Sequence, residues 1–527
     1  MCDSQIKNPE KCVSRKVGLF YFLWLGEHGR HKPYDISKIT ALHPDAGYHP
    51  DDGYFGGIGV YHHWGEPFYG YYYSDDEWVV RRHMKLIMQA GVDFLYFDTT
   101  NALIYENNAK LVMRVLEEYF LLGHRIPKVM FYTNTASGAT VRKLYDAIYR
   151  DGFCRDTWFM IDGRPAVIAF PEELDDELRG FFTVKLPQWP NELAKVGGWP
   201  WMDFTKPQRI FTNAAGEPEC ISVSVAQHPQ LRFGDSVLYG EEGNCGRAYH
   251  NGANDRSPDA YKYCFNFTEQ FERALESGVP YIMVTGWNEW IAGRWQGIPE
   301  RPVMFVDCAN YEYSRDIEMM RGGYFDNYYR CLCKFTAAAH NRSDDAVCTA
   351  ALSIGDTVSF IGYTDGAMRR DHEGYGCRYE NHTGRHAIDR ISAGRGEDSL
   401  TLTLHTTDND FSDRSGTFMT LYLRTEDGEP SSFTIGTYDF ERCTAVMTVT
   451  TQNGEYSGTI PARIELDEAS DGYSISVDVP VAAFGGSEKI YLKAADSTDA
   501  IVTPEDLYDH GDVLPLGYGE FAIKLTR

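Results

Sequence analysis

Up to about residue 335, the hydrophobic residues gather in short, almost unbroken runs, which are separated by longer stretches of mixed polarity. Runs of this kind are typical of parallel strands that are buried on both faces of a sheet. There are eight such runs, the number of strands that closes a (β/α)8 barrel of the TIM type. They are Val17–Leu25, Val92–Asp98, Lys128–Thr133, Ala166–Phe170, Phe181–Leu186, Trp199–Phe204, Ile221–Ala226 and Tyr281–Gly286.

Several of the stretches between these runs have the periodicity of amphipathic helices. Asp75 and Asp76 precede one of them and Gly91 follows it, and these residue types favour the two ends of a helix. Further helices are predicted at Glu106–Gly123, at Gly138–Tyr149 and from about Pro258 to Gly278. The alternation of strands and helices therefore predicts an α/β fold.

After His340 the pattern changes to short alternating runs such as SLTLTLHT and YSISVDVP, with turns of Gly, Asp and Asn between them. This pattern is typical of a β-sandwich or jelly roll. We therefore predict a catalytic barrel over residues 1–337, a linker near Ala338–Val347 and an accessory β-sandwich over residues 348–527. The sandwich either binds carbohydrate or only braces the barrel. Its acidic run Asp408–Asp413 is interpreted as solvated turns or, alternatively, as a calcium site.

The composition narrows the class of ligand. A formal net charge of −26 argues against nucleic acid and anionic lipid surfaces, because phosphate binding needs clustered Lys and Arg. A neutral ligand is expected. No apolar run is long enough to cross a bilayer, and the first twelve residues lack the apolar segment of a signal peptide. The 12 cysteines lack the spacing of metal sites, which favours free thiols in a reducing compartment. A cytoplasmic protein, or an exported one whose signal has been removed, fits these features; no cofactor or metal is predicted, and the oligomeric state stays open.

Catalytic groups of (β/α)8 barrels lie at the carboxyl ends of the strands. The ends of the predicted strands carry carboxylates, amides, histidines and tryptophans, a combination that suits a sugar. Acids act on the glycosidic oxygen, amides bind hydroxyls and indole faces contact C–H groups. The predicted site residues at strand ends are His28, Asp98, Asn134, Gln188, Trp189, Trp201, Asp203, His228, Trp287, Asn288, Glu289 and Trp290. His62, His63 and Arg294 are added as candidate substrate contacts.

The segment VTGWNEWIAGRW is the most specific motif in the chain. Here the sequence resembles glycoside hydrolase families 99 and 71 and the related domains found beside polysaccharide-synthesis enzymes. Members of that group end a late barrel strand in a Trp/Phe-Asn-Glu-Trp motif, which Trp287 to Trp290 match. The segments YHHWGEPFYGYYYSDDEWVVRRHMKLIMQAGVDFLYFDTTN and SRDIEMMRGGYFDNYY extend the similarity over most of residues 17–330. The resemblance implies that Glu289 is the active-site carboxylate. It also implies a retaining, endo-acting α-mannosidase that uses the 2-hydroxyl of its own substrate.

The chain departs from family 99 at one important position. In that family a second glutamate, three residues beyond the first, serves as the acid/base partner, and Ala292 stands there in this chain. Glycosidic cleavage normally needs two carboxylates. Glu312, which lies near Asp307 in the sequence, is the first candidate for the second one. Asp98 follows and then Asp203, while Glu241 and Glu242 are predicted to cap the pocket.

Other interpretations stay open. Glu289 is alternatively a buried structural acid paired with Arg294, Asp98 a helix cap, and His62 and His63 packing residues. Two functions remain. The first is a glycoside hydrolase that cleaves a neutral poly- or oligosaccharide with Glu289 at its centre. The second is a carbohydrate-binding or glycan-assembly protein that does not hydrolyse, on the same barrel; a polysaccharide lyase fits the acidic chain poorly.

Overall fold

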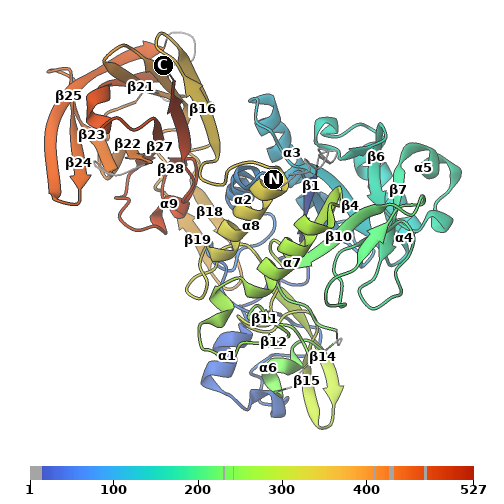
Figure 1. Ribbon diagram of the computed structural model, residues 1–527. Helices are drawn as coiled ribbons and strands as arrows, with labels where there is room; N and C mark the ends of the chain where they lie inside the picture. Colours follow the sequence, from blue (N-terminus) through green and yellow to red (C-terminus); the bar gives the residue numbers. More distant parts are fainter. Residues whose placement is uncertain are drawn as a thin grey trace, which may run out of the picture.

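Eight parallel strands form a nearly closed barrel and follow one another around it in chain order (Figure 1). The computed structural model describes residues 15–229, 232–240, 243–407, 410–426, 432–467 and 472–526. The barrel strands are β1 (Lys16–Tyr21), β3 (Phe94–Thr99), β4 (Lys128–Thr133), β6 (Arg164–Ile168), β7 (Thr183–Gln188), β8 (Gly198–Pro200), β10 (Pro218–Ser224) and β13 (Tyr281–Thr285). The predicted TIM-type barrel is therefore confirmed, with all eight runs supplying strands.

The ring closes in two different ways. On one side, β13 pairs with β1 in parallel, so the last strand adjoins the first. On the other side, the short strand β9 (Ile210–Thr212) pairs with β10 in antiparallel fashion. There the thiol of Cys220 donates to the carbonyl oxygen of Gly198 in β8 at 3.4 Å. The run predicted at Trp199–Phe204 is a strand only at its start, because β8 ends at Pro200.

Helices cover the outside of the barrel, although not after every strand. They are α2 (Glu77–Ala90), α3 (Glu106–Leu121), α4 (Ser137–Leu144) with a π-helical turn at Tyr145–Tyr149, α5 (Asp176–Phe181), α7 (Phe265–Ser277) and α8 (Asn327–Ala339). The connections that follow β7 and β8, at 189–197 and 201–217, are fully described and contain no helix. None of the helices among the described residues is long and apolar enough to cross a membrane.

The predicted helix ends agree with the structure except at α7. Asp76 caps α2 by accepting a hydrogen bond from the backbone N–H of Val79, and Gly91 ends the helix with a φ of 78°. A helix from about Pro258 is wrong, since α7 begins only at Phe265. Cys264, directly before it, has a φ of 57°, a left-handed conformation that cannot continue a helix.

Two insertions build a small antiparallel sheet over the carboxyl end of the barrel. After β1 come α1 (Ile36–Leu42) and β2 (Tyr61–His63), and after β13 come β14 (Ile291–Ile298) and β15 (Arg301–Phe305). β14 pairs with both β2 and β15. The β14–β15 hairpin projects at the lower edge of the molecule, far from the C-terminal strands (Figure 1). The connection from β10 to α7 adds α6 (Asp235–Leu238), β11 (Tyr249–His250) and β12 (Ala253–Asn254).

The C-terminal part forms the predicted β-sandwich. Its strands run in the order β16-β29-β27-β22-β23-β24-β25-β26-β21-β20-β17, with β28 beside β27. β25 pairs with β24 through residues 454–461 and with β26 through residues 462–467, so one long strand passes from the first sheet to the second. In β21 Leu400, Leu402 and Leu404 point into the core and alternate with partly exposed residues.

The bounds of the sandwich strands, in chain order, are as follows: β16 (Cys348–Leu352), β17 (Thr357–Ile361), β20 (Ile388–Arg395), β21 (Ser399–Thr406), β22 (Thr417–Thr425), β23 (Ser432–Asp439), β24 (Thr444–Thr451), β25 (Gly454–Asp467), β26 (Gly472–Pro480), β27 (Lys489–Ser497), β28 (Asp512–Leu514) and β29 (Phe521–Leu525). The short helix α9 (Asp506–Asp509) precedes β28. In the acidic run, Asp410 accepts from the N–H of Ser412 and Asp413 from that of Ser415, as in turns; Asp408 and Asn409 lie outside the described residues.

One segment of the sandwich crosses to the barrel. Between β17 and β20 the chain forms the hairpin β18 (Arg370–Glu373) and β19 (Arg378–Asn381). Arg370 donates to Asp76 of α2 at 2.8 Å. The hydroxyl oxygens of Tyr375 and Tyr379 accept the backbone N–H groups of Gly26 and Tyr71, both at 2.7 Å. This segment, residues 363–386, is therefore part of the barrel surface; we call it the crossing segment.

Candidate active site

Glu289 follows β13 and is bound by a buried arginine. Oε2 of Glu289 accepts hydrogen bonds from Nε of Arg315 at 2.8 Å and from Nη2 at 2.5 Å. For the other oxygen, Oε1, no hydrogen bond to a described residue is found. Burial raises the pKa of the Glu289 carboxyl well above its ordinary value, and the charge of Arg315 acts against that rise. One oxygen of Glu289 is thus fixed while the other stays available.

The second carboxylate at this arginine is Asp307. Its Oδ1 lies 3.2 Å from Nη2 of Arg315, and its side chain is 29% exposed. Because Oε2 of Glu289 and Oδ1 of Asp307 contact the same nitrogen, at 2.5 and 3.2 Å, they lie at most about 5.7 Å apart, which is the sum of the two distances. Asp307 has a φ of 76°, a left-handed conformation that Asp tolerates better than most residues.

His228, which follows β10, completes this group. Its Nδ1 lies 3.1 Å from Nη1 of Arg315, and its Nε2 lies 3.5 Å from Oδ1 of Asp307. Burial lowers the pKa of His228 well below its ordinary value, as does the charge of Arg315. A guanidinium only donates, so Nδ1 must accept and the proton of the neutral ring must sit on Nε2, toward Asp307.

Asp98, at the end of β3, lies in the same electrostatic field. Burial raises its pKa, the charge of Asp307 adds to that rise and the charge of Arg315 opposes it. Its Oδ1 accepts from the N–H of Thr100 at 3.0 Å. The alternative that Asp98 caps the next helix is wrong, because the residue before α3 is Tyr105. We call Glu289, Asp307, His228, Asp98 and Arg315 the acid cluster.

The remaining residues of the Trp-Asn-Glu-Trp motif hold the framework. The side-chain amide of Asn288 accepts from the N–H of Phe22 at 2.9 Å and donates to its carbonyl at 3.1 Å, which ties β13 to β1. The indole of Trp290 donates to Glu318 at 2.5 Å, and Trp287 is fully buried. These three predicted substrate contacts therefore point inward.

Asp316 fixes the backbone of Glu289 from behind. One of its oxygens accepts from the N–H of Glu289, and the other accepts from the indole of Trp64 at 2.7 Å. Burial raises the pKa of Asp316 to about 7. The backbone of the segment that carries Arg315 is in turn joined to Gly286, with Ile317 donating to its carbonyl at 3.1 Å. The acid cluster is therefore held by main-chain contacts as well as by ion pairs.

Aromatic rings surround the acid cluster. Tyr61 of β2 stacks on His28 with 4.3 Å between ring centroids, and Trp24 meets Tyr61 edge-on at 6.0 Å. The guanidinium of Arg315 lies 5.2 Å from the ring of Trp201, which contacts Trp189. The indole nitrogens of Trp24 and Trp201 are buried and have no partner among the described residues. Each is a donor that the hydroxyl of a ligand would satisfy.

Several predicted residues lie in other environments. The Glu312 carboxylate accepts from the N–H of Ala248 at 3.0 Å, and burial raises its pKa to about 7; the opposing positive charge there is that of Arg247. Asp203 is held by Arg209 at 2.8 Å.

The other polar candidates lie apart from the acid cluster or in the barrel framework, and the ring nitrogens of His63 are buried with no partner among the described residues. The amide of Gln188 accepts from the N–H of Lys195 at 2.8 Å and so closes the loop after β7. His62 and His63 are buried in β2, and burial lowers the pKa of His62 to about 3. Asn134 is half-buried at the end of β4. Glu241 and Glu242 lie outside the described residues.

Arg294 also lies elsewhere. It is the partner that Glu289 would have if Glu289 were a structural acid. Its guanidinium donates to the carbonyl oxygens of Gly56 and Pro50 in the loop before β2. The alternative that Glu289 pairs with Arg294 is therefore wrong, and Arg315 is the partner. Arg315 was missed because it lies in a loop beyond the motif rather than at a strand end. An arginine between acids in SRDIEM, close to apolar residues, is the signal that would have indicated it.

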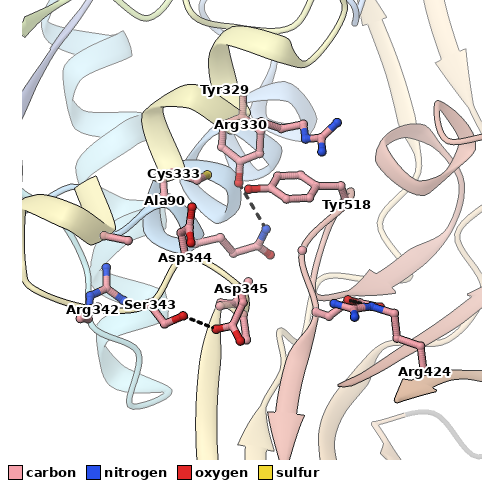
Figure 2. Close-up of a pocket in the computed structure, with 16 residues that line it drawn as sticks. Ala90, Tyr329, Arg330, Cys333, Arg342, Ser343, Asp344, Asp345, Arg424 and Tyr518 are labelled. Carbon is pink, nitrogen blue, oxygen red and sulfur yellow. Dashed lines mark hydrogen bonds and ion pairs between the residues drawn. The ribbon is translucent and has the colours of Figure 1, made fainter. Parts of the chain in front are cut away.

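A separate cavity of about 240 Å³ lies between α8 and the sandwich (Figure 2). It is not lined by any residue of the acid cluster. Its polar groups bind one another and the neighbouring strands: Asp345 accepts from Ser343 at 2.6 Å and from Tyr491 at 2.8 Å. Arg424 donates to Glu520 at 2.7 Å. The cavity therefore belongs to the joint between barrel and sandwich.

Comparison with known proteins finds similarity only among solved structures; no protein-family model and no curated protein matches the chain. One similar structure is the GH99 endo-alpha-mannosidase from Bacteroides thetaiotaomicron in complex with BIS-TRIS-propane, with 17% identity, a TM-score of 0.36, and coverage of 62% of this chain and 97% of that one. A second structure of that enzyme has 16% identity and the same TM-score and coverage. A glycoside hydrolase-like protein has 12% identity, a TM-score of 0.33, and coverage of 64% and 97%. The assignment of the fold rests on the strand order described above.

Proposed function

We propose that the protein is a glycoside hydrolase that cleaves a neutral poly- or oligosaccharide between Glu289 and Asp307. The observation that carries this proposal is that two carboxylates share one buried arginine at the carboxyl end of a (β/α)8 barrel. Their oxygens lie at most about 5.7 Å apart, and retaining glycosidases hold their carboxyl groups about 5–5.5 Å apart, against about 6.5–9.5 Å in inverting ones. This upper limit joins the two oxygens that contact Arg315, and it includes the spacing of a retaining reaction, which we propose here.

The environments of the two carboxylates suggest a division of roles. Burial raises the pKa of Glu289, and Oε1 is the oxygen not held by Arg315, so Glu289 is suited to donate a proton from Oε1 to the departing oxygen. Asp307 is partly exposed and lies beside the positive charge of Arg315, which suits a carboxylate acting at the anomeric carbon. In the second step water attacks that carbon, the bond to Asp307 breaks and Glu289 takes the proton of the water.

The surroundings of the acid cluster support a sugar as the ligand. The rings of Trp24 and Tyr61 offer flat apolar faces, against which the C–H groups of a sugar ring pack. The unpartnered indole N–H groups of Trp24 and Trp201 are donors for hydroxyl groups. A net charge of −26 favours a neutral substrate over an anionic one.

The test is a reducing-sugar and chromatographic screen against plant, fungal and bacterial glycans. Wild type, Glu289→Gln and Asp307→Asn are compared, with Glu312→Gln as the control carboxylate. We expect wild-type cleavage of at least one glycan and a loss of about 10²–10⁴-fold in each of the first two variants, the usual contribution of a group that transfers protons. Glu312→Gln should keep its activity. Equal activity in Glu289→Gln and wild type would show that the chemistry takes place elsewhere.

A second function is favoured by one specific observation. Ala292, which replaces the second glutamate of family 99, is buried in β14 and pairs with His62, so no acid reaches the site from that position. A carbohydrate-binding or glycan-assembly protein would need no second acid. Binding of a glycan without cleavage by the wild-type protein would support this alternative.

A further inference from the structure

Trp295 of β14 differs from the other tryptophans of this chain in its exposure to solvent. All ten tryptophans lie in the described residues, and only Trp295 is exposed, with 58% of its surface accessible. Single exposed apolar residues are common on protein surfaces and need no explanation by themselves. The position of Trp295 relative to the acid cluster distinguishes it from such residues.

Two glycines flank Trp295 on its face of β14. Side chains alternate along a strand, so Gly293 and Gly297 are its neighbours on that face. A Cβ atom at Gly293 would lie 3.2 Å from the indole nitrogen of Trp295 and 3.5 Å from the ring of Tyr61. At Gly297 a Cβ atom would meet the carbonyl oxygen of Arg301 at 1.9 Å, so only glycine fits there. The indole therefore lies over the backbone of Gly293 and reaches toward Tyr61, and its cross-strand neighbour in β15 is Met304.

Tyr61 connects this platform to the acid cluster. It pairs with Gly293 across the two strands, and it contacts Trp24 and His28. Its pKa is raised by burial and then by the charge of Asp307, so its hydroxyl lies in the field of the acid cluster. Trp24, Tyr61 and Trp295 thus form a row of aromatic rings, in which Tyr61 lies in the field of Asp307 and Trp295 lies on the exposed hairpin; we call it the aromatic row.

We propose that Trp295 is a distal sugar-binding subsite, and that the protein acts on glycan chains long enough to reach from the acid cluster to the β14–β15 hairpin. This inference rests on the proposed function for the position of bond cleavage. A flat indole with 58% of its surface exposed suits the C–H face of a sugar ring, through apolar burial and dispersion. The row leads from the acid cluster toward the β14–β15 hairpin, so part of the chain would be bound on that side of the cleaved bond.

The experiment compares Trp295→Ala and Trp295→Phe with a matched control, Ile298→Ala. Ile298 is 46% exposed on the same hairpin but on the opposite face of β14. Each change is made in the Glu289→Gln chain, which should bind without cleaving. Migration is measured in native gels that contain soluble α-mannan, galactomannan or mixed-linkage β-glucan. We expect retardation by at least one polysaccharide, and binding about tenfold weaker after loss of the indole, as for one aromatic contact. Trp295→Phe should retain part of the binding and Ile298→Ala all of it.

Kinetics separate this inference from the proposed function. For a glycan that the wild-type enzyme cleaves, Trp295→Ala should raise KM for a hexasaccharide and leave the cleavage of the shortest accepted oligosaccharide unchanged. Cleavage that is equal in Trp295→Ala and wild type at every chain length overturns the subsite but not the hydrolase. Retardation that depends on Trp295, without cleavage by the wild-type protein, overturns the hydrolase but supports the subsite. No retardation in any gel, or a dimer that Trp295→Ala converts to a monomer, overturns the subsite.

Discussion

Arg315 organises the acid cluster because a single guanidinium serves Glu289, Asp307 and His228 at once. The five N–H donors of an arginine have a fixed planar arrangement, which sets the relative positions of the groups that accept from it. A lysine has no such plane. The geometry of the proposed active site therefore depends on a residue that takes no part in proton transfer itself.

Replacing Arg315 tests this dependence. Arg315→Met should lower the free energy of unfolding by about 3–5 kcal/mol, because Oε2 of Glu289 loses both of its hydrogen-bond donors and Asp307 loses its positive neighbour. Arg315→Lys should cost less stability and still reduce activity, since one ammonium cannot hold both oxygens. Urea unfolding and the glycan assay measure the two effects. Arg321→Met is the control: Arg321 is half exposed and lies 3.6 Å from Glu66, so it should change stability by less than about 1 kcal/mol. Equal losses in the two methionine variants would contradict the prediction.

At the scale of single residues, the sequence predicted the site residues at strand ends better than those in loops. Glu289, Asp98 and His228 follow barrel strands, so a rule about strand ends finds them. Asp307 and Arg315 lie in the loop after β15, and that loop is placed by long-range contacts such as Ile317 to Gly286. Local pattern carries no information on such contacts. Asp307 was named only as a neighbour of Glu312, and Arg315 was not assigned a role.

At the scale of the elements, continuous apolar runs predicted all eight barrel strands because each strand is buried on both faces. The helix ends were predictable where a residue acts by itself, as Asp76 and Gly91 do in α2. The start of α7 was not, since the left-handed conformation of Cys264 is imposed by its surroundings rather than by its residue type. Also unpredicted was that Asp76 serves a second element, the crossing segment, through Arg370.

Two substitutions separate the roles of Asp76. Asp76→Asn keeps an oxygen for the N–H of Val79 and removes the charge that pairs with Arg370, so it should destabilise the protein by about 3–5 kcal/mol. Asp76→Ala also removes the cap and should cost about 0.5–2 kcal/mol more. Thermal or urea unfolding gives both values. Asp75→Asn, one residue earlier, is the control: its ion pair with Arg30 is partly exposed, so the change should cost less than about 1 kcal/mol. If Asp76→Asn is as stable as wild type, the ion pair with Arg370 contributes nothing measurable.

At the scale of the whole molecule, buried carboxyl groups link stability to pH. Burial raises the pKa of Asp512 in β28 to about 7, and its Oδ2 accepts from the N–H of Ile388 at 2.7 Å. An unfolded Asp has a pKa of about 3.9. Between these two values the folded protein holds a proton that the unfolded chain has lost, so this group's contribution to stability falls as the pH rises from about 4 to 7.

Asp512→Asn should remove that dependence. The side-chain oxygen of asparagine still accepts from Ile388, and it carries no charge at any pH. The free energy of unfolding of wild type, relative to the variant, should therefore decrease between about pH 4 and 7, by up to about 4 kcal/mol for a shift of this size. Urea unfolding at a series of pH values measures it. Parallel curves for the two proteins across this range would contradict the prediction.

The crossing segment has a consequence for how such a protein can arise and be altered. Arg370, Tyr375 and Tyr379 lie in the C-terminal half of the chain, yet they bind Asp76 and the backbone N–H groups of Gly26 and Tyr71 in the barrel. A gene cut after residue 347 would encode a barrel that lacks these contacts beside α2, with Asp76 still capping the helix but without Arg370. Recombination that exchanged the C-terminal domain alone would remove contacts from both the barrel and that domain. The two halves are therefore expected to have been inherited together. In related chains, the barrel and the C-terminal part should show the same evolutionary history.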